Sequence, residues 1–187
     1  QQEASRKLGF SVGNTMRIAQ QLYESGKITY MRTDSVNLSN TAIGMAKQEI
    51  TNLYGEEYVK TRKFTNKIKG AQEAHEAIRP TYMNNQTVDG NPDSVRLYNL
   101  IWKRTIASQM SNAELEKTIV NISTSGATKL FTAIGEVIKF DGFLKVYLEG
   151  TDDDNVENQG LLPVMKSGDE LTLMEMRARE RYSKHLP

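Results

Sequence analysis

Two kinds of hydrophobic periodicity divide the chain near residue 113. Before that point apolar residues recur at helical spacing. The expected helices are residues 1–8, one capped by Asn14 or Thr15, one capped by Ser39, and one begun by Asn91 and Pro92. Gly9, Gly26 and Gly55 stand where the first three should end. Between the second and third helices, the β-prone run Ile28–Thr33 predicts a short extended segment.

After Ser111 apolar and polar residues alternate, which predicts β-strands over 118–123, 130–137, 144–148 and 171–176. The fold class expected is therefore α+β, with a helical domain over 1–113 and antiparallel strands of a partial β-rich domain over 114–187. One face of such a sheet needs covering, so we expect its other strands in chain outside this sequence. The chain also starts without methionine and stops just after a charged run, which suggests a piece of a longer protein.

Composition narrows the classes of protein. The 187 residues are 38% hydrophobic and 25% charged, as in globular proteins, and the apolar stretches are too short to cross a bilayer. The absence of cysteine removes disulfides and thiol catalysis. The net charge of +1 hides an asymmetry: residues 1–110 carry 15 Lys and Arg against 10 Asp and Glu, and the remainder 9 against 13. The basic stretch 60–79 is compatible with a polyanionic partner, although solvated lysines also explain it.

The segment Ile28–Ser35 carries the first candidate chemistry. In an extended strand, Tyr30 and Arg32 project from one face about 7 Å apart. A phenol is a poor nucleophile unless a neighbour stabilises its anion, and a guanidinium does this while also binding phosphate oxygens. The alternative is structural: the tyrosine packs across a sheet, the arginine pairs with Asp34, and Asp34-Ser35 turns the chain.

Two further groups accompany it. His75 lies among the acids of Gln72–Thr81 and precedes Arg79; a neighbouring carboxylate favours the imidazolium, which suits a phosphate contact or proton relay. The alternative is a helical turn ended by Pro80 with its charges in solvent. Gln20 and Glu24 share one face of the second helix, where a carboxylate could orient Arg32 or accept a proton, unless the pair is simply a polar helix face.

Other chemistries lack their motifs. The sequence has no Gly-rich nucleotide loop, no paired-histidine metal motif and no Gly-x-Ser-x-Gly elbow. The acidic run 152–159 is interpreted as a surface loop rather than a metal site.

In combination, the motifs are more specific than any one of them. Four segments occur in the order found in type IA DNA topoisomerases: Gln1–Phe10, Ile28–Ser35, Ala74–Thr81 and Ile138–Gly142. The spacing of the last three matches as well, and the chain resembles the bacterial topoisomerase I branch over essentially its whole length. Met31 and Glu76 favour that branch over topoisomerase III, which usually has proline after the tyrosine.

The resemblance implies a role for each site residue. Tyr30 matches the tyrosine that attacks a phosphate of single-stranded DNA and becomes joined to the 5′ end, so that resealing needs no ATP. Arg32 matches the arginine that stabilises the scissile phosphate, and His75 matches the active-site histidine. The residues that match the surroundings of the tyrosine are Gln20, Glu24, Thr29, Thr33 and Asp34, and Arg79 is expected to support DNA binding with them.

The resemblance also implies what lies outside the chain. The family binds Mg²⁺ through a Toprim domain and closes its DNA gate with a further helical domain; neither is present, so no metal is expected here. Residues 1–113 would be the mobile tyrosine-bearing domain of the toroid, and 114–187 part of its arch. The implied partners are single-stranded DNA and the missing domains, without a membrane, in the bacterial cytoplasm with the nucleoid. The alternatives are a non-catalytic single-stranded nucleic-acid-binding module and a structural hinge or interaction domain.

Overall fold

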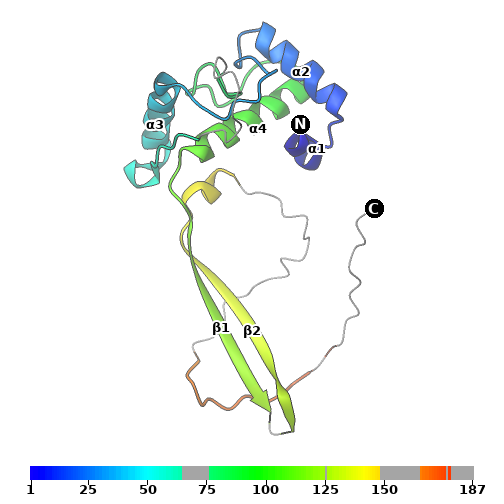
Figure 1. Cartoon of the computed structure of the whole chain (residues 1–187), viewed down its shortest axis with the longest axis vertical. Helices are drawn as coiled ribbons and strands as arrows, with labels where there is room; N and C mark the ends of the chain where they lie inside the picture. Colours follow the sequence, from blue (N-terminus) through cyan, green and yellow to red (C-terminus); the bar gives the residue numbers. More distant parts are fainter. Residues whose placement is uncertain (65–75, 125, 148–164, 176, 178–187) are drawn as a thin grey trace.

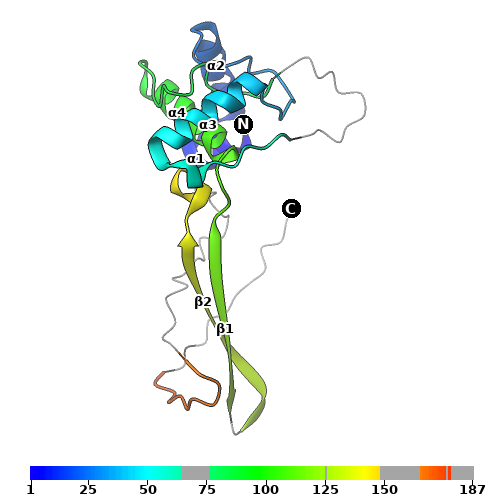
Figure 2. The same cartoon turned by 90° about the vertical axis from the view of Figure 1, so that its left-hand side faces the viewer.

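Helices gather at one end of the molecule and a long two-stranded ribbon extends from them (Figures 1 and 2). The computed structural model describes residues 1–64, 76–124, 126–147, 165–175 and 177. Within these ranges the helices are α1 (Gln2–Leu8), α2 (Val12–Glu24), α3 (Asn40–Tyr54) and α4 (Pro92–Ser108), the strands are β1 (Glu114–Thr124) and β2 (Ala127–Phe140), and the 3₁₀ turns are η1 (Glu56–Tyr58) and η2 (Gly142–Lys145). The α+β prediction is confirmed.

Local capping explains where the helices begin and end. The Ser39 hydroxyl accepts from the Ala42 amide at 3.2 Å, and the Asn91 side chain from the Ser94 amide at 2.9 Å. Gly9 ends α1 with a φ of 69°, a left-handed conformation that glycine adopts without strain. These predictions are confirmed.

The cap expected for the second helix is wrong. Ser11 caps α2, because its hydroxyl accepts from the Asn14 amide at 3.2 Å and its carbonyl from the Thr15 amide at 2.9 Å. Asn14 and Thr15 therefore lie in the first turn. Ser11 is hydrogen-bonded to the amides of Asn14 and Thr15, so the helix begins three residues earlier than a cap at Asn14 would allow.

Helix α4 forms the centre of the helical end, where it packs against α1, α2 and α3. Its buried residues include Leu97, Tyr98, Trp102 and Ile106. The polar tips of the two aromatics are satisfied, since the Trp102 indole donates to the Met83 carbonyl at 2.7 Å and the Tyr98 hydroxyl to the Asn85 carbonyl at 2.6 Å. Packing on α4 holds α2 in place, and the end of α2 leads into the candidate site.

The strands β1 and β2 pair antiparallel, as predicted, with Ile119 opposite Ile134 and Leu115 opposite Ile138. These four apolar side chains are 39% to 57% exposed, so the described part of the chain leaves this face of the ribbon uncovered. That further strands outside this sequence cover the face remains a prediction.

Two predicted strands are wrong. Residues 142–145 form η2, in which the Leu144 amide donates to the Asp141 carbonyl at 3.0 Å and the Tyr147 amide to the Phe143 carbonyl at 3.0 Å; Leu148 lies outside the described residues. The chain turns back there because Tyr147 is buried against the helical end, with its hydroxyl 2.5 Å from Glu3 Oε1. Residues 171–175 form neither helix nor strand, since no neighbouring strand in the described ranges offers them a ladder of hydrogen bonds; Met176 lies outside those ranges.

A close crossing joins the ribbon to the helical end. Gly142 has a φ of +50°, and a Cβ at this position would collide with the Asn112 carbonyl oxygen. The Phe143 amide donates to the Ser111 carbonyl at 2.9 Å, and the Tyr58 hydroxyl to Asp141 at 2.7 Å. The division into domains at residue 113 remains a prediction, and residues 140–147 return to pack on the helical core.

Candidate functional site

The site begins where α2 ends. The Gly26 amide donates to the Tyr23 carbonyl and the Lys27 amide to the Leu22 carbonyl, both at 2.8 Å, and Gly26 has a φ of 68°. This is the Schellman pattern of helix termination, which turns the chain sharply and connects the helix to the next segment without a loop. Tyr30 follows four residues later, so the end of α2 determines where its segment starts.

Thr29 brings together the two motifs that carry the candidate chemistry. Its hydroxyl donates to the Ala77 carbonyl and accepts from the Arg79 amide, both at 2.9 Å, and its own amide donates to the Arg79 carbonyl at 2.9 Å. Ile28 and Pro80 form an antiparallel bridge beside it, and the Thr81 amide donates to the Lys27 carbonyl at 3.0 Å. Segments some 50 residues apart in sequence thus lie side by side.

The extended strand predicted over Ile28–Thr33 is wrong, because only Ile28 pairs with a neighbouring segment, at Pro80. Pro80 has no amide hydrogen to continue a ladder, and the chain bends at Met31 and Arg32. The expected alternation survives without the strand: Tyr30 is 38% exposed, Met31 is 4% exposed, and Arg32 is exposed. The buried methionine anchors the segment, and the tyrosine and arginine on either side of it reach solvent.

Gln20 and Glu24 lie on the last two turns of α2. The Gln20 amide donates to Glu24 Oε1 at 2.6 Å, so the two predicted support residues contact each other. The ring of Tyr23, from the same helical turn, meets the ring of Tyr30 edge to face, with centroids 5.2 Å apart and planes at 67°. Of these three side chains at the end of α2, Tyr23 contacts the predicted nucleophile, and Gln20 and Glu24 contact each other.

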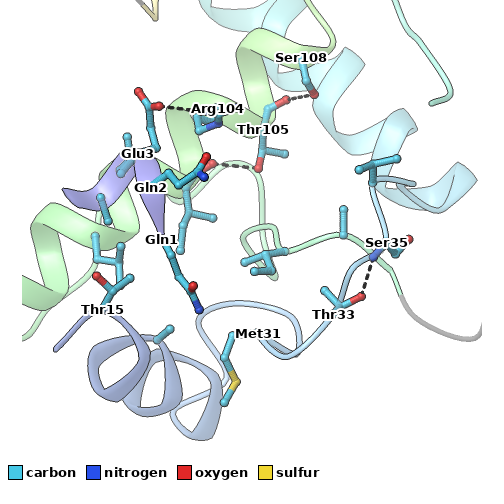
Figure 3. Close-up of a pocket in the computed structure, with 18 of the residues that line it drawn as sticks. Gln1, Gln2, Glu3, Thr15, Met31, Thr33, Ser35, Arg104, Thr105 and Ser108 are labelled. Atoms are coloured by element: carbon cyan, nitrogen blue, oxygen red, sulfur yellow. Dashed lines mark hydrogen bonds and ion pairs between the residues drawn. The ribbon is translucent and has the colours of Figure 1, made fainter. Parts of the chain in front are cut away.

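Thr33 and Asp34 continue from Arg32 into one wall of a cleft of about 950 Å³. The Ser35 amide donates to the Thr33 hydroxyl at 3.1 Å, which turns the chain there. The opposite walls come from the N-terminal Gln1 and from α1 and α4, including Glu3, Arg104 and Ser108 (Figure 3). Met31 lines the same cleft, so the cleft lies against the anchored side of the tyrosine segment.

Arg79 serves the local fold. Its side chain is 12% exposed; one nitrogen pairs with Glu76 at 2.9 Å and another donates to the Pro80 carbonyl at 2.8 Å. Glu76 also accepts from the Ser39 amide at 2.7 Å, which links this arginine to the start of α3. Burial by itself would raise the pKa of Glu76, but the hydrogen bonds from Arg79 and Ser39 outweigh it and hold the pKa below its usual value. A DNA contact by Arg79 remains a prediction.

Part of the predicted site cannot be placed. His75 and the basic residues Lys67 and Lys69 lie outside the described residues. Of the same basic stretch, Arg62 donates to the carbonyls of Ser108 and Met110 at 3.2 and 2.5 Å, at the end of α4. This contact is neither of the two explanations expected for the basic stretch, because the Arg62 cation satisfies carbonyls that the end of α4 leaves unpaired.

Tyr23 is the site residue that the sequence did not single out. It is 39% exposed and its ring contacts that of Tyr30. The available signal was its place between Gln20 and Glu24 on one helical face. Among the described residues, no three His, Asp or Glu side chains lie close enough to hold a metal ion, and no helix there is long and apolar enough to cross a membrane.

Comparison with known proteins identifies relatives of this chain. A family model described as DNA topoisomerase matches residues 1–186. DNA topoisomerase 1 of Zymomonas mobilis is 45% identical over 195 residues, covering 100% of this chain and 16% of the relative. DNA topoisomerase 1 of Streptomyces coelicolor is 48% identical over 187 residues, covering 94% of this chain and 20% of the relative.

A solved structure is similar as well. Full-length topoisomerase I from Thermotoga maritima superposes with a TM-score of 0.71 at 41% identity, over 89% of this chain and 27% of that protein. The chain thus spans between about a sixth and a quarter of the length of these relatives.

Proposed function

Because the chain belongs to the type IA DNA topoisomerase family, we propose that it is the tyrosine-bearing segment of a longer enzyme that relaxes negatively supercoiled DNA. One observation carries the proposal: the Tyr30 ring is 38% exposed on a segment that Thr29 ties to residues 77–79, with the exposed Arg32 two residues on. Such a placement supports attack on a backbone phosphate, since the phenol reaches solvent while its backbone is anchored.

The proposed reaction is a reversible transesterification. The Tyr30 oxygen attacks a phosphorus of single-stranded DNA, and the bond from that phosphorus to the 3′-oxygen breaks as the new bond forms. The phenol proton passes to a base, for which Glu24 at the end of α2 is the candidate in this chain, and the leaving 3′-oxygen takes up a proton. After another strand passes through the gap, the 3′-hydroxyl attacks the 5′-phosphotyrosine and restores the DNA. No ATP is consumed because one phosphodiester replaces another.

The other residues stabilise charge and hold the geometry. Arg32 offers a planar fork of donors to the phosphate oxygens as charge develops on them. Thr29, Thr33 and Asp34 shape the segment on either side of Tyr30 and Arg32, and Gln20 orients Glu24 through their 2.6 Å hydrogen bond. His75 is proposed as a further phosphate contact on the strength of the family resemblance alone.

Mg²⁺ is proposed to act from another part of the longer protein. The described residues do not fit a Mg²⁺ site, since they contain no cluster of three candidate ligands. When bound by the Toprim domain of the full-length enzyme, the ion would neutralise phosphate charge. The roles of Tyr30 and Arg32 are assigned without it. The proposed partners are single-stranded DNA and the Toprim and gate domains, and the proposed location is the bacterial cytoplasm, with the nucleoid.

The test replaces Tyr30 by phenylalanine in the full-length enzyme. Phenylalanine fills the same space but has no oxygen to attack phosphorus, so we expect cleavage and relaxation to be abolished while DNA binding stays within a few-fold. A 3′-labelled oligonucleotide on a denaturing gel reveals the covalent adduct, and Tyr82→Phe, the same change at a 60% exposed tyrosine, is the control. An adduct that survives in Tyr30→Phe contradicts the proposal. A wild-type enzyme that binds DNA but never forms an adduct favours the non-catalytic binding module.

A further inference from the structure

Tyr23 contacts the predicted nucleophile directly. The two ring centroids lie 5.2 Å apart and the ring planes meet at 67°, the edge-to-face arrangement that aromatic pairs favour. Both rings are exposed to a similar degree, 39% for Tyr23 and 38% for Tyr30. This contact is therefore not part of the buried core, and general packing does not require it.

The two tyrosines differ in how firmly their backbones are held. Tyr23 belongs to a regular thirteen-residue helix, and its carbonyl accepts the 2.8 Å hydrogen bond from Gly26 that closes the helix end. Tyr30 lies two residues beyond the Ile28–Pro80 bridge, on chain that forms neither helix nor strand. Thr29 and Met31 anchor the backbone on both sides of Tyr30. A tyrosine side chain has several staggered rotamers in general, and a ring contact from a regular helix favours one of them.

We propose that Tyr23 is a positioning residue for Tyr30: its ring restricts the rotamers of Tyr30, so that the phenol oxygen is held where a phosphate can meet it. The inference rests on the proposed function, because it assigns Tyr23 a part in the same cleavage step. It requires the ring of Tyr23 and not its hydroxyl. A displacement of the reacting atoms by about 1 Å reduces the rate on the order of a hundredfold, so the loss of this contact should cause a measurable fall in the cleavage rate.

The experiment uses Tyr23→Ala, Tyr23→Phe and Tyr23→Leu in the full-length enzyme. Single-turnover cleavage of an oligonucleotide gives the rate, fluorescence anisotropy gives the Kd for the same oligonucleotide, and thermal unfolding monitors the fold. Alanine is the best helix former, so α2 should persist in the first variant. Val12→Ala, at the other end of α2 on a 57% exposed side chain, is the matched control.

We expect Tyr23→Ala to slow cleavage at saturating DNA by about ten- to a hundredfold, with Kd within about twofold of wild type. Tyr23→Phe should restore the wild-type rate because it keeps the ring. Tyr23→Leu keeps apolar bulk without a ring, so it should remain slow, and it provides the test should the alanine variant unfold.

Three results would overturn the inference. Wild-type cleavage by Tyr23→Ala or Tyr23→Leu shows that the contact positions nothing. A Tyr23→Phe variant as slow as Tyr23→Ala assigns the effect to the hydroxyl. A weakened Kd with an unchanged rate at saturation makes Tyr23 a DNA contact instead. Tyr30→Phe in the same assays separates these from failure of the proposed function, since an adduct in that variant removes Tyr30 as nucleophile whatever Tyr23 does.

Discussion

At the scale of single residues, Arg32 and Arg79 differ in how far solvent reaches their side chains, and this difference indicates different roles. Arg32 is exposed on the irregular segment after Tyr30, whereas the Arg79 side chain is 12% exposed and ion-paired to Glu76 at 2.9 Å. A partner entering from solvent can reach the first guanidinium, and the second is already bound to groups of its own chain. Among residues whose placement the structure describes, Arg32 is thus the better candidate to stabilise the phosphate under attack.

We expect Arg32→Lys to be a damaging change. Lysine keeps the charge but loses the planar fork of donors, so cleavage in the full-length enzyme should fall by roughly ten- to a thousandfold, the range for loss of one transition-state donor. Single-turnover cleavage measures the effect. Arg17→Lys is the control, since Arg17 lies on α2 and donates to Asn14 at 2.7 Å. Wild-type cleavage by Arg32→Lys would show that the arginine is only structural.

At the scale of elements, the site depends on a short junction between segments rather than on a sheet. Thr29 makes side-chain hydrogen bonds of 2.9 Å to both the Ala77 carbonyl and the Arg79 amide. Glu76 and Ala77 in turn bond to Ser39 and Asn37 at the start of α3. The tyrosine segment is therefore fastened, through residues 76–81, to a third part of the chain.

Thr29→Val should loosen this junction. Valine has nearly the same shape but no hydroxyl, so the Arg79 amide and the Ala77 carbonyl each lose a partner, which costs about 1–3 kcal/mol for each group left unsatisfied. We expect a lower midpoint in urea unfolding and, because Tyr30 is the next residue, slower cleavage by about tenfold or more. Thr29→Ser, which keeps the hydroxyl, should recover most of both. Equal stability and equal cleavage in Thr29→Val and wild type would mean that the junction does not hold the nucleophile.

At the scale of the whole molecule, a helical end that carries the site is joined to a long two-stranded ribbon (Figure 1). Among the described residues, one face of this ribbon exposes its apolar side chains. Glu3 ties the helical end and the ribbon together, because Tyr147 donates to it at 2.5 Å and Arg104 lies 3.3 Å from it. The hydrogen bond from Tyr147 and the positive charges of Arg104, Arg6 and Lys7 lower the pKa of Glu3, although burial by itself would raise it. The helical end thus has an ordered connection to the ribbon, while the ribbon itself lacks a covering layer among the described residues.

The isolated 187-residue chain should bind single-stranded DNA weakly, with steep salt dependence, and should not relax supercoiled DNA. Phosphoryl transfer depends mainly on positioning and charge stabilisation, and we propose that the Mg²⁺ site and the opposite wall of the gate belong to other domains. Plasmid relaxation with Mg²⁺, beside Tyr30→Phe, measures this. Robust relaxation that Tyr30→Phe abolishes would show that the chain holds the complete catalytic machinery.

The sequence by itself determined the features that depend on neighbouring residues. The caps at Ser39 and Asn91 and the stop at Gly9 were predictable because a helix end is satisfied by groups within three or four residues of it. The alternation that predicts β1 and β2 is likewise local. The cap of α2 is Ser11 and not Asn14 or Thr15, although all three residue types can cap a helix. Ser11 has the extended backbone of a cap, with φ −66° and ψ 158°, whereas Asn14 and Thr15 are already helical.

Only the tertiary structure decided which distant groups meet. Four features depend on where other elements pack: the pairing of Ile28 with Pro80, the 3₁₀ turn of 142–145 in place of a strand, the ion pair of Arg79 with Glu76, and the contact of Tyr23 with Tyr30. Local propensity favoured strands over 28–33 and 144–148, but a strand forms only where a partner offers its backbone groups. The segment that pairs with 28–33 has Pro80 at the bridge, and proline has no amide hydrogen to continue a ladder. Residues 144–147 instead turn back, so that Tyr147 is buried against Glu3 and α4.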